Sequence, residues 1–138
     1  EISLGLVGSE MCIRDRFTVE ERVAMLQECC KNIPNVTVEG FDGLTVEFAK
    51  KRHASVMVRG LRAVTDFENE IQLAQTNHAL MPGIETMFLA TSIKWSYLSS
   101  TIVKEAAYYG SDISKFVTPN VEKAVNEKYA QLREREKI

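Results

Sequence analysis

A short apolar run, "ASVMVRG" over residues 54–60, limits the possible folds of this chain more than any other feature. Its apolar side chains are continuous and do not alternate with polar ones, which is typical of a strand buried on both faces. A helical segment follows from Thr65 to Leu80, and "IETMFLAT" over residues 84–91 then has the composition of a second strand. This order predicts a right-handed parallel crossover. The chain is therefore expected to form an open α/β sheet with ligands at the carboxyl ends of its strands.

The remaining elements continue this alternation. Spacing and end signals predict helices over 18–31 and 44–52, a strand over 36–41, a helix between Ser99 and Gly110, and a last helix from Thr118. The first helix opens with a capping box from Thr18 to Glu21, and the segment Thr65–Glu68 forms a second one. Leu44 and Phe48 are expected to face inward from the short helix. The closing charge run, "REREKI", is expected to be a solvated helix end.

Composition and charge exclude several classes of protein. The 138 residues carry a net charge of −2 and give a pI of about 5.8, whereas a general nucleic-acid binder is usually basic. No apolar run approaches roughly 18 residues, so no membrane span is expected. The three cysteines, Cys12, Cys29 and Cys30, do not suggest a disulfide framework, which favours a reduced, cytoplasmic chain. His53 and His78 lack ligand-like spacing, so no metal site is predicted on the protein.

The segment Arg59-Gly60-Leu61-Arg62 follows the apolar strand directly, at the sheet edge where ligands bind. Two arginines there can hold phosphate oxygens through charge-assisted hydrogen bonds, and glycine lets the backbone approach a ligand closely. The start of the next helix adds a partial positive charge. The same arginines can instead pair with the carboxylates of Asp66, Glu68 and Glu70. Spacing alone leaves phosphate binding and local ion pairing equally open.

The segment "KWSYLSSTIVKE", residues 94–105, is the second candidate site. Three hydroxyl residues, Ser99–Thr101, precede a helix, where hydroxyl and backbone N–H groups can form a cradle for an anion. Trp95 and Tyr97 could flank a flat base. Ordinary N-capping with aromatic side chains in the core explains the same pattern, and this segment alone favours that simpler explanation.

Together these segments resemble one family of enzymes. The matching pieces occur in a fixed order between Phe17 and Lys128: "FTVEER", "RGLRAVTDFENE", the N-x-x-L-M-P element over 77–82, and "WSYLSSTIVKE". They closely resemble the bacterial pantetheine-phosphate adenylyltransferases. The resemblance implies a Rossmann-like α/β fold with an open parallel sheet of the nucleotidyltransferase type, assembled as a homohexamer in the complete protein. It also implies a cytoplasmic enzyme of coenzyme A biosynthesis.

The resemblance implies the reaction and its ligands as well. The family transfers the adenylyl group of ATP to 4′-phosphopantetheine and releases dephospho-coenzyme A and pyrophosphate. Mg²⁺ accompanies ATP, and coenzyme A is an expected feedback ligand; neither nucleic acid nor membrane is an expected partner. The phosphopantetheine phosphate attacks the α-phosphorus of ATP in line, so no covalent enzyme intermediate is needed. Arginines and serines can then suffice, by orienting the phosphates and stabilising charge.

The functional positions of the family fall on defined residues of this chain. Arg59 corresponds to the arginine on the phosphopantetheine side. Thr45 corresponds to a residue of the pantetheine pocket that is often Met or Leu in the family, so a threonine is a departure. ATP contacts are implied for Gly60, Leu61, Arg62, Glu70, Trp95, Ser96, Tyr97, Leu98, Ser99, Ser100 and Thr101.

The front of the chain departs from the family, which begins with a strand, a T-x-G-H motif that opens a helix, and a second strand. No Gly-His pair occurs in this chain, and Ile13 stands where the family has a substrate-binding lysine. The histidine that stabilises the transition state is thus absent, and no catalytic residue is assigned. Residues 1–16, "EISLGLVGSEMCIRDR", resemble translated adapter sequence, and we expect them to be foreign to the natural protein.

Residues 17–138 are then expected to be a partial adenylyltransferase domain that lacks its first strand-helix-strand unit. We expect the activity of the chain as written to be strongly impaired. Two other interpretations stay open: a non-catalytic domain that binds ATP or coenzyme A, and a fragment with no function of its own. The enzyme is favoured because Arg59 and the Trp95–Thr101 segment supply groups for both substrates, which a binding module would not need.

Overall fold

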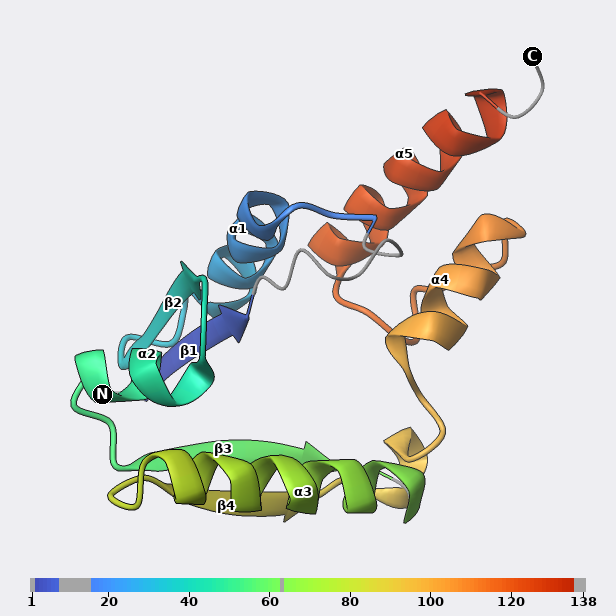
Figure 1. Cartoon of the computed structure of the whole chain (residues 1–138). Helices are drawn as coiled ribbons and strands as arrows, with labels where there is room; N and C mark the ends of the chain where they lie inside the picture. Colours follow the sequence, from blue (N-terminus) through green and yellow to red (C-terminus); the bar gives the residue numbers. More distant parts are fainter. Residues whose placement is uncertain (1, 8–15, 63, 136–138) are drawn as a thin grey trace. The chain divides into compact units, whose positions relative to one another are not determined.

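The structure is a computed structural model that describes residues 2–7, 16–62 and 64–135 (Figure 1). Its elements are β1 (Ile2–Val7), α1 (Val19–Cys30), β2 (Val36–Phe41), α2 (Thr45–Lys51), β3 (Val56–Leu61), α3 (Val64–Leu80), β4 (Glu85–Ala90), the 3₁₀ helix η1 (Ile93–Trp95), α4 (Ser100–Tyr108) and α5 (Pro119–Arg135). The helices and strands predicted from residue 18 onward are all confirmed, with small shifts at their ends. The sequence did not predict η1.

Strands and helices alternate along the chain, which confirms the predicted Rossmann-like α/β class. β3 and β4 pair in parallel, with Arg59 opposite Phe88. Within the described residues the strands pair two by two, as β1–β2 and β3–β4. The chain forms two compact units: the first combines most of the chain up to Gly40 with the chain from Leu98 onward, and the second spans Phe41–Tyr97.

The second unit is built on the β3–β4 pair, and α3 runs alongside both strands (Figure 1). Exposure alternates along β3, because Val58 is 61% exposed whereas Met57 and Arg59, on the other face, are half-buried. Met87 of β4 lies opposite Val58 and is also exposed. The prediction that this strand is buried on both faces is therefore wrong for one face. The reason is that α3 packs on the side that carries Arg59.

Helix α2 contributes most of a small core in the second unit, where Val46 and Ala49 are buried. The sequence predicts Leu44 to face inward, but Leu44 is the N-cap residue of α2 and is 52% exposed. That prediction is wrong because the helix begins one residue later and turns Val46 and Ala49 inward instead. Phe48 does pack, since its ring stacks on Phe41 with 4.1 Å between the centroids.

In the first unit, helix α1 begins with the predicted capping box. The Thr18 hydroxyl accepts a hydrogen bond from the Glu21 amide at 3.2 Å, and Glu21 Oε2 accepts one from the Thr18 amide at 2.8 Å. Lys128 of α5 donates to Glu21 Oε1 at 2.6 Å and lies 5.3 Å from the centroid of the Phe17 ring. Hydrogen bonding to Lys128, and then to Thr18, lowers the pKa of Glu21. The start of α1 is thus held by its own cap and by α5.

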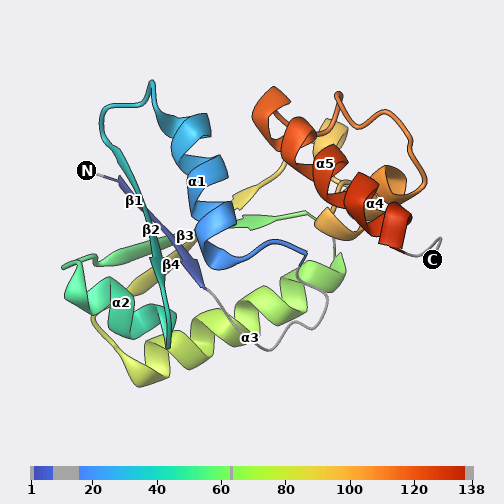
Figure 2. The same cartoon turned by 90° about the horizontal axis from the view of Figure 1, so that it is seen from above.

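The main core of the first unit lies between α4 and α5, which run side by side (Figure 2). Its buried residues are Val103, Ala107, Ile113, Val125 and Tyr129. As predicted, Gly110 closes α4, and its φ is 76°. The Gly110 amide donates to the Ala107 carbonyl at 3.1 Å, and the following amide donates to the Ala106 carbonyl at 2.9 Å. This is a Schellman arrangement, which favours glycine because of the positive φ.

The end of α5 departs from its prediction. The first residue of the "REREKI" run, Arg133, is half-buried instead of solvated. Its Nη1 donates to the carbonyls of Ala107 and Tyr108, both at 2.9 Å. The prediction is wrong for Arg133 because its partners lie on α4, about 25 residues earlier in the chain, where local charge patterning gives no signal.

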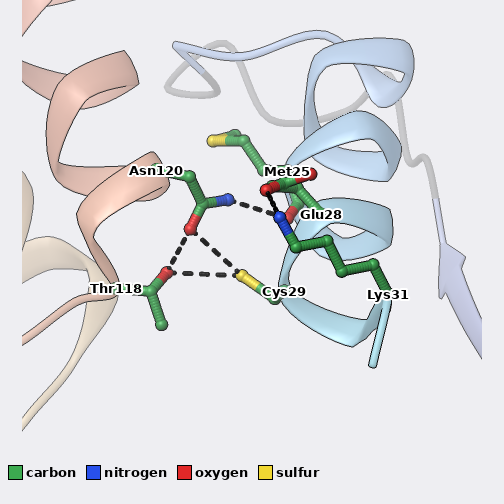
Figure 3. Close-up of polar contacts among 6 residues, drawn as sticks. All are labelled: Met25, Glu28, Cys29, Lys31, Thr118 and Asn120. Carbon is green, nitrogen blue, oxygen red and sulfur yellow. Dashed lines mark hydrogen bonds and ion pairs between the residues drawn. The ribbon is translucent and has the colours of Figure 1, made fainter. Parts of the chain in front are cut away.

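The beginning of α5 contacts the end of α1 (Figure 3). Asn120 Nδ2 donates to the Met25 carbonyl at 3.0 Å. Cys29 Sγ lies 3.3 Å from Thr118 Oγ1 and 3.4 Å from Asn120 Oδ1. These contacts tie together two helix ends that are about 90 residues apart in the sequence.

Helix α3 begins at Val64, so Thr65 lies within its first turn and not at its N-cap. The structure describes the backbone of Thr65 but not its side chain, so its predicted capping contacts stay a prediction. Further along α3, the Thr76 hydroxyl donates to the Gln72 carbonyl at 2.8 Å. Such a bond to the preceding turn gives a helix little stability.

We therefore expect two threonine substitutions to differ in their effect on folding. Thr18→Ala removes the N-cap of α1 and should lower the free energy of unfolding by about 1 kcal/mol. Thr76→Ala, the matched control inside α3, should leave it unchanged or slightly raised, since alanine favours helix. Urea unfolding followed by circular dichroism measures both values. Equal effects of the two substitutions would contradict the role given to the Thr18 cap.

Candidate functional site

Two charged residues of the candidate phosphate site contact each other directly. Arg59 Nη2 donates to Glu70 Oε1 at 2.7 Å, and Arg59 Nε donates to Glu70 Oε2. Arg59 comes from β3 and Glu70 from the second turn of α3. The side chains of Arg59 and Glu70 keep 34% and 19% of their surfaces exposed. Local ion pairing, one of the two interpretations of the arginine segment, is therefore confirmed for Arg59.

This pairing sets the charge state of the site. The hydrogen bond from Arg59 holds the pKa of Glu70 below its ordinary value of 4.5, against the opposing effect of burial, and the charges of Arg59 and Arg62 add to the lowering. The hydrogen bond to Glu70 in turn raises the pKa of Arg59. Both groups are charged at neutral pH. Two parallel bonds between a guanidinium and a carboxylate also fix the orientation of both planes.

The glycine beside Arg59 has no cause in the packing of the described residues. A Cβ added to Gly60 would meet no atom within 4 Å, and its φ is not in the left-handed region. Leu61 is half-buried at the end of β3, and Arg62 follows it with an exposed side chain. Among the described residues, Gly60 therefore has open space beside its backbone near the end of β3.

The predicted nucleotide segment divides between the two units after Tyr97. In the second unit, Ser96 follows η1, and its Oγ donates to the first carbonyl of that helix at 2.9 Å. The Lys94 ammonium lies 4.6 Å from the centroid of the Trp95 ring. Trp95 and Tyr97 are 36% and 57% exposed. The explanation that these aromatic side chains belong to the core is therefore wrong.

In the first unit, Ser99 is the N-cap residue of α4, and its Oγ accepts from the Ile102 amide at 3.2 Å. Ordinary N-capping is thus confirmed for Ser99. Ser100 and Thr101 are the first two residues of the helix, where backbone N–H groups have no acceptor within the helix. Such N–H groups are available to an anion. Leu98, just before them, packs against the main core.

Of the predicted site residues, the structure brings together Arg59 and Glu70, with Arg62 near enough to lower the pKa of Glu70. Thr45 is the first residue of α2 and is half-buried in the same unit. The segment Leu98–Thr101 belongs to the other unit. Within the β3–α3 part of the candidate site, the direct contact is the Arg59–Glu70 ion pair.

The described residues do not fit a metal site held by the protein. They include no group of three His, Cys, Asp or Glu side chains that could bind a metal ion. A magnesium ion that arrives with ATP would be held largely by the phosphates and by water, which is common for Mg²⁺. Among the helices that the structure describes, none is long and apolar enough to cross a membrane.

Comparison with known proteins identifies the family. The cytidylyltransferase-like family matches residues 8–106. A phosphopantetheine adenylyltransferase of Lachnoclostridium phytofermentans is 59% identical over 113 residues, which are 82% of this chain and 69% of that protein. This chain belongs to the phosphopantetheine adenylyltransferase family. The enzyme of that name from Cupriavidus taiwanensis is 49% identical over 86% of this chain and 73% of its own length, and the one from Caldanaerobacter subterraneus is 50% identical over 84% and 72%.

Two of the contacts that the sequence did not predict bear on the candidate nucleotide segment and on α4. Lys94 covers the Trp95 ring, and Arg133 binds the end of α4. The first could have been suggested by the adjacent cation and indole. The contact of Arg133 could not have been predicted. The known preference for a cation near a helix C-terminus applies to residues of that same helix, whereas Arg133 belongs to α5 and contacts α4.

The Arg59–Glu70 pair predicts a pH-dependent stability. Because the pKa of Glu70 is lowered in the folded state, the pair stabilises the fold above pH 4.5, and this contribution is lost as the pH falls through the lowered value. Glu70→Gln should therefore destabilise the protein at about pH 7, and this deficit should disappear as the pH falls from there through the lowered pKa of Glu70. Urea unfolding across this range measures the effect, with Glu68→Gln, an exposed position on the same helix, as the control. A deficit that is the same at both ends of the range would contradict the pairing.

Proposed function

We propose that the complete protein represented by this chain transfers the adenylyl group of ATP to 4′-phosphopantetheine. Family membership supports this reaction, since relatives that are 59% and 49% identical carry the name phosphopantetheine adenylyltransferase. The observation that carries the assignment of the site is the Arg59–Glu70 pair at the exit of β3. It joins a residue expected to bind phosphopantetheine to a residue expected to bind ATP. A contact between groups for two substrates supports a transferase over a domain that binds one ligand.

Arg59 can bind a phosphate without releasing Glu70. A guanidinium carries five N–H donors. Glu70 accepts from Nε and from Nη2, so the donors on Nη1 and the second one on Nη2 are left for phosphate oxygens. In this proposal, Glu70 orients the guanidinium, and Arg59 holds the phosphate of 4′-phosphopantetheine by the bidentate geometry that favours arginine over lysine.

In the proposed reaction, a phosphate oxygen of 4′-phosphopantetheine attacks the α-phosphorus of ATP. The bond from that phosphorus to the bridging oxygen of the β-phosphate breaks, and pyrophosphate leaves with the electron pair. Arg59 positions the attacking phosphate and offsets its charge, and Arg62, on the same unit, binds phosphate oxygens of ATP. The exposed Trp95 ring offers a flat surface for the adenine.

The proposal includes the setting of the enzyme. MgATP is the nucleotide substrate, coenzyme A acts as a feedback ligand, and the complete protein is a cytoplasmic homohexamer. The support for these features is the family resemblance of the segment between Phe17 and Lys128. Thr45, half-buried at the start of α2, is proposed to line the pantetheine pocket.

We also propose that the chain as written turns over slowly because residues 1–16, of which 8–16 fall inside the family match, do not carry the catalytic motif of the family. The sequence contains no counterpart of the T-x-G-H motif, and Ile13 stands at the position of the substrate lysine. Loss of one group that stabilises charge in the transition state typically lowers the rate by about 10²–10³-fold. Because Ile13 also replaces the substrate lysine, binding of 4′-phosphopantetheine is expected to be weakened along with turnover.

A non-catalytic domain that binds ATP or coenzyme A is the second candidate function. The exposed aromatic rings of Trp95 and Tyr97 offer a nucleotide base surfaces to stack on without any second substrate. The two candidates differ in what they require of Arg59. A domain that binds only a nucleotide would use Arg59 for the phosphates of that nucleotide, whereas the transferase uses it for the phosphate of 4′-phosphopantetheine.

The experiment that separates them restores the front of the protein. Residues 1–16 are replaced by the segment that precedes the matched region in the Lachnoclostridium phytofermentans relative, and pyrophosphate release is measured with ATP and 4′-phosphopantetheine. We expect the chimera to be at least about 10²-fold faster than the chain as written, because the group that stabilises the transition state returns. The same chimera with Arg59→Met is the control for turnover at this site. A chimera that folds and binds ATP but releases no pyrophosphate would support the binding domain instead.

A further inference from the structure

The last helix, α5, lies beyond residues 8–106 that match the cytidylyltransferase-like family, yet it contacts both α1 and α4. We propose that Arg133 of α5 is a positioning residue for ATP that acts through α4. It holds one end of α4, while the opposite end presents Ser100 and Thr101 to the phosphates. This inference rests on the proposed function, because it assumes that α4 contacts the nucleotide. All of its contacts lie within the first unit.

Arg133 binds the C-terminal end of α4 with one nitrogen. Its Nη1 donates to the carbonyls of Ala107 and Tyr108, both at 2.9 Å. The Ala107 carbonyl also accepts from the Gly110 amide at 3.1 Å, so Arg133 adds a charged donor to a helix end that the Schellman turn already closes. The guanidinium also places a positive charge at the negative end of the helix dipole. Because the side chain is half-buried, this charge is screened less than one in open solvent.

The place of Arg133 is itself fixed by the rest of α5. Tyr129, one turn earlier, is only 3% exposed and packs in the core with Val103 and Ala107 of α4. Lys128 is tied to Glu21 of α1 at 2.6 Å. Arg133 therefore extends from an anchored helix, and its contact with α4 is part of the packed unit.

Contacts that stabilise the last turn of α4 also stabilise its first turn, because the helix is short. α4 has nine residues, and helices of this length are marginal without outside support. Helix formation is cooperative, so contacts that hold the last turn also raise the population of the first. The first turn is defined by the bonds from the Ile102 amide to Ser99 Oγ at 3.2 Å and from the Val103 amide to the Ser99 carbonyl at 3.1 Å. When this turn is formed, the N–H groups before it point together from the helix end, as anion binding requires.

The test uses the chain as it exists, with three variants. Arg133→Ala removes both hydrogen bonds and the positive charge. Arg133→Lys keeps the charge but not the planar guanidinium. Lys123→Ala is the matched control. Lys123 lies on the same helix, is exposed, and has Nζ 4.0 Å from Glu127 of that helix. Titration calorimetry measures the Kd for MgATP and for 4′-phosphopantetheine separately. Amide exchange by NMR at Ile102 and Val103, without ligand, measures the first turn of α4.

We expect Arg133→Ala to speed exchange at Ile102 and Val103 by about tenfold, since a hydrogen bond from a charged donor is worth about one power of ten or more. MgATP binding should weaken by up to the same factor, according to how far the population of the formed first turn falls. Arg133→Lys should fall between Arg133→Ala and wild type, and Lys123→Ala should match wild type. The Kd for 4′-phosphopantetheine should stay unchanged in all three variants, which a general loss of structure would not allow.

Unchanged exchange at both amides, or MgATP binding in Arg133→Lys and Arg133→Ala that equals wild type, would overturn the inference. If Arg133→Ala does not fold, the comparison of Arg133→Lys with Lys123→Ala decides the question, and equal Kd values and equal exchange would overturn it. A wild-type chain that binds no MgATP contradicts the proposed nucleotide site instead. The exchange measurement, made without ligand, then still decides whether Arg133 holds the first turn of α4.

Discussion

The ion pair between Arg59 and Glu70 is the interaction on which the candidate site depends. It exists because the register of β3 puts Arg59 on the face covered by α3, while Val58 and Gly60 face the other way. A shift of one residue in this register would move Arg59 to the exposed face, since side chains alternate along a strand. The pair therefore links the pairing of β3 with β4, the placement of α3, and the chemistry at the strand exit. Removing either partner would leave the other a half-buried charge without its counter-ion.

Much of this arrangement follows from the sequence, for local reasons. The capping box at Thr18 and the glycine at Gly110 act through neighbouring atoms, so their residue types are informative by themselves. The parallel β3–β4 pair follows from the strand-helix-strand order. The sequence left two interpretations for the arginine segment, and the structure shows the ion pair for Arg59. That pair does not exclude phosphate binding, because Glu70 engages two of the five donors of the guanidinium.

The features that the sequence did not reveal depend on the choice of distant partners. Leu44 looked like a core residue by spacing, but the start of α2 at Thr45 turned it outward. Arg133 looked solvated because it belongs to a charge run, yet α4 supplies two carbonyls for it. Long side chains can reach several partners, and only the packing of helices decides among them. For the same reason, no sequence motif marks the contact between α5 and the end of α4. Helix α5 also lies outside the cytidylyltransferase-like match.

The central claim is that Glu70 orients Arg59 for the phosphate of 4′-phosphopantetheine, and a double-mutant cycle tests it most directly. Titration calorimetry would measure 4′-phosphopantetheine binding to the wild type, Arg59→Met, Glu70→Gln and the double variant. We expect Glu70→Gln to weaken binding when Arg59 is present and to have no further effect when it is absent, with a coupling free energy of about 1 kcal/mol or more. Independent effects, with a coupling below about 0.5 kcal/mol, would contradict the account.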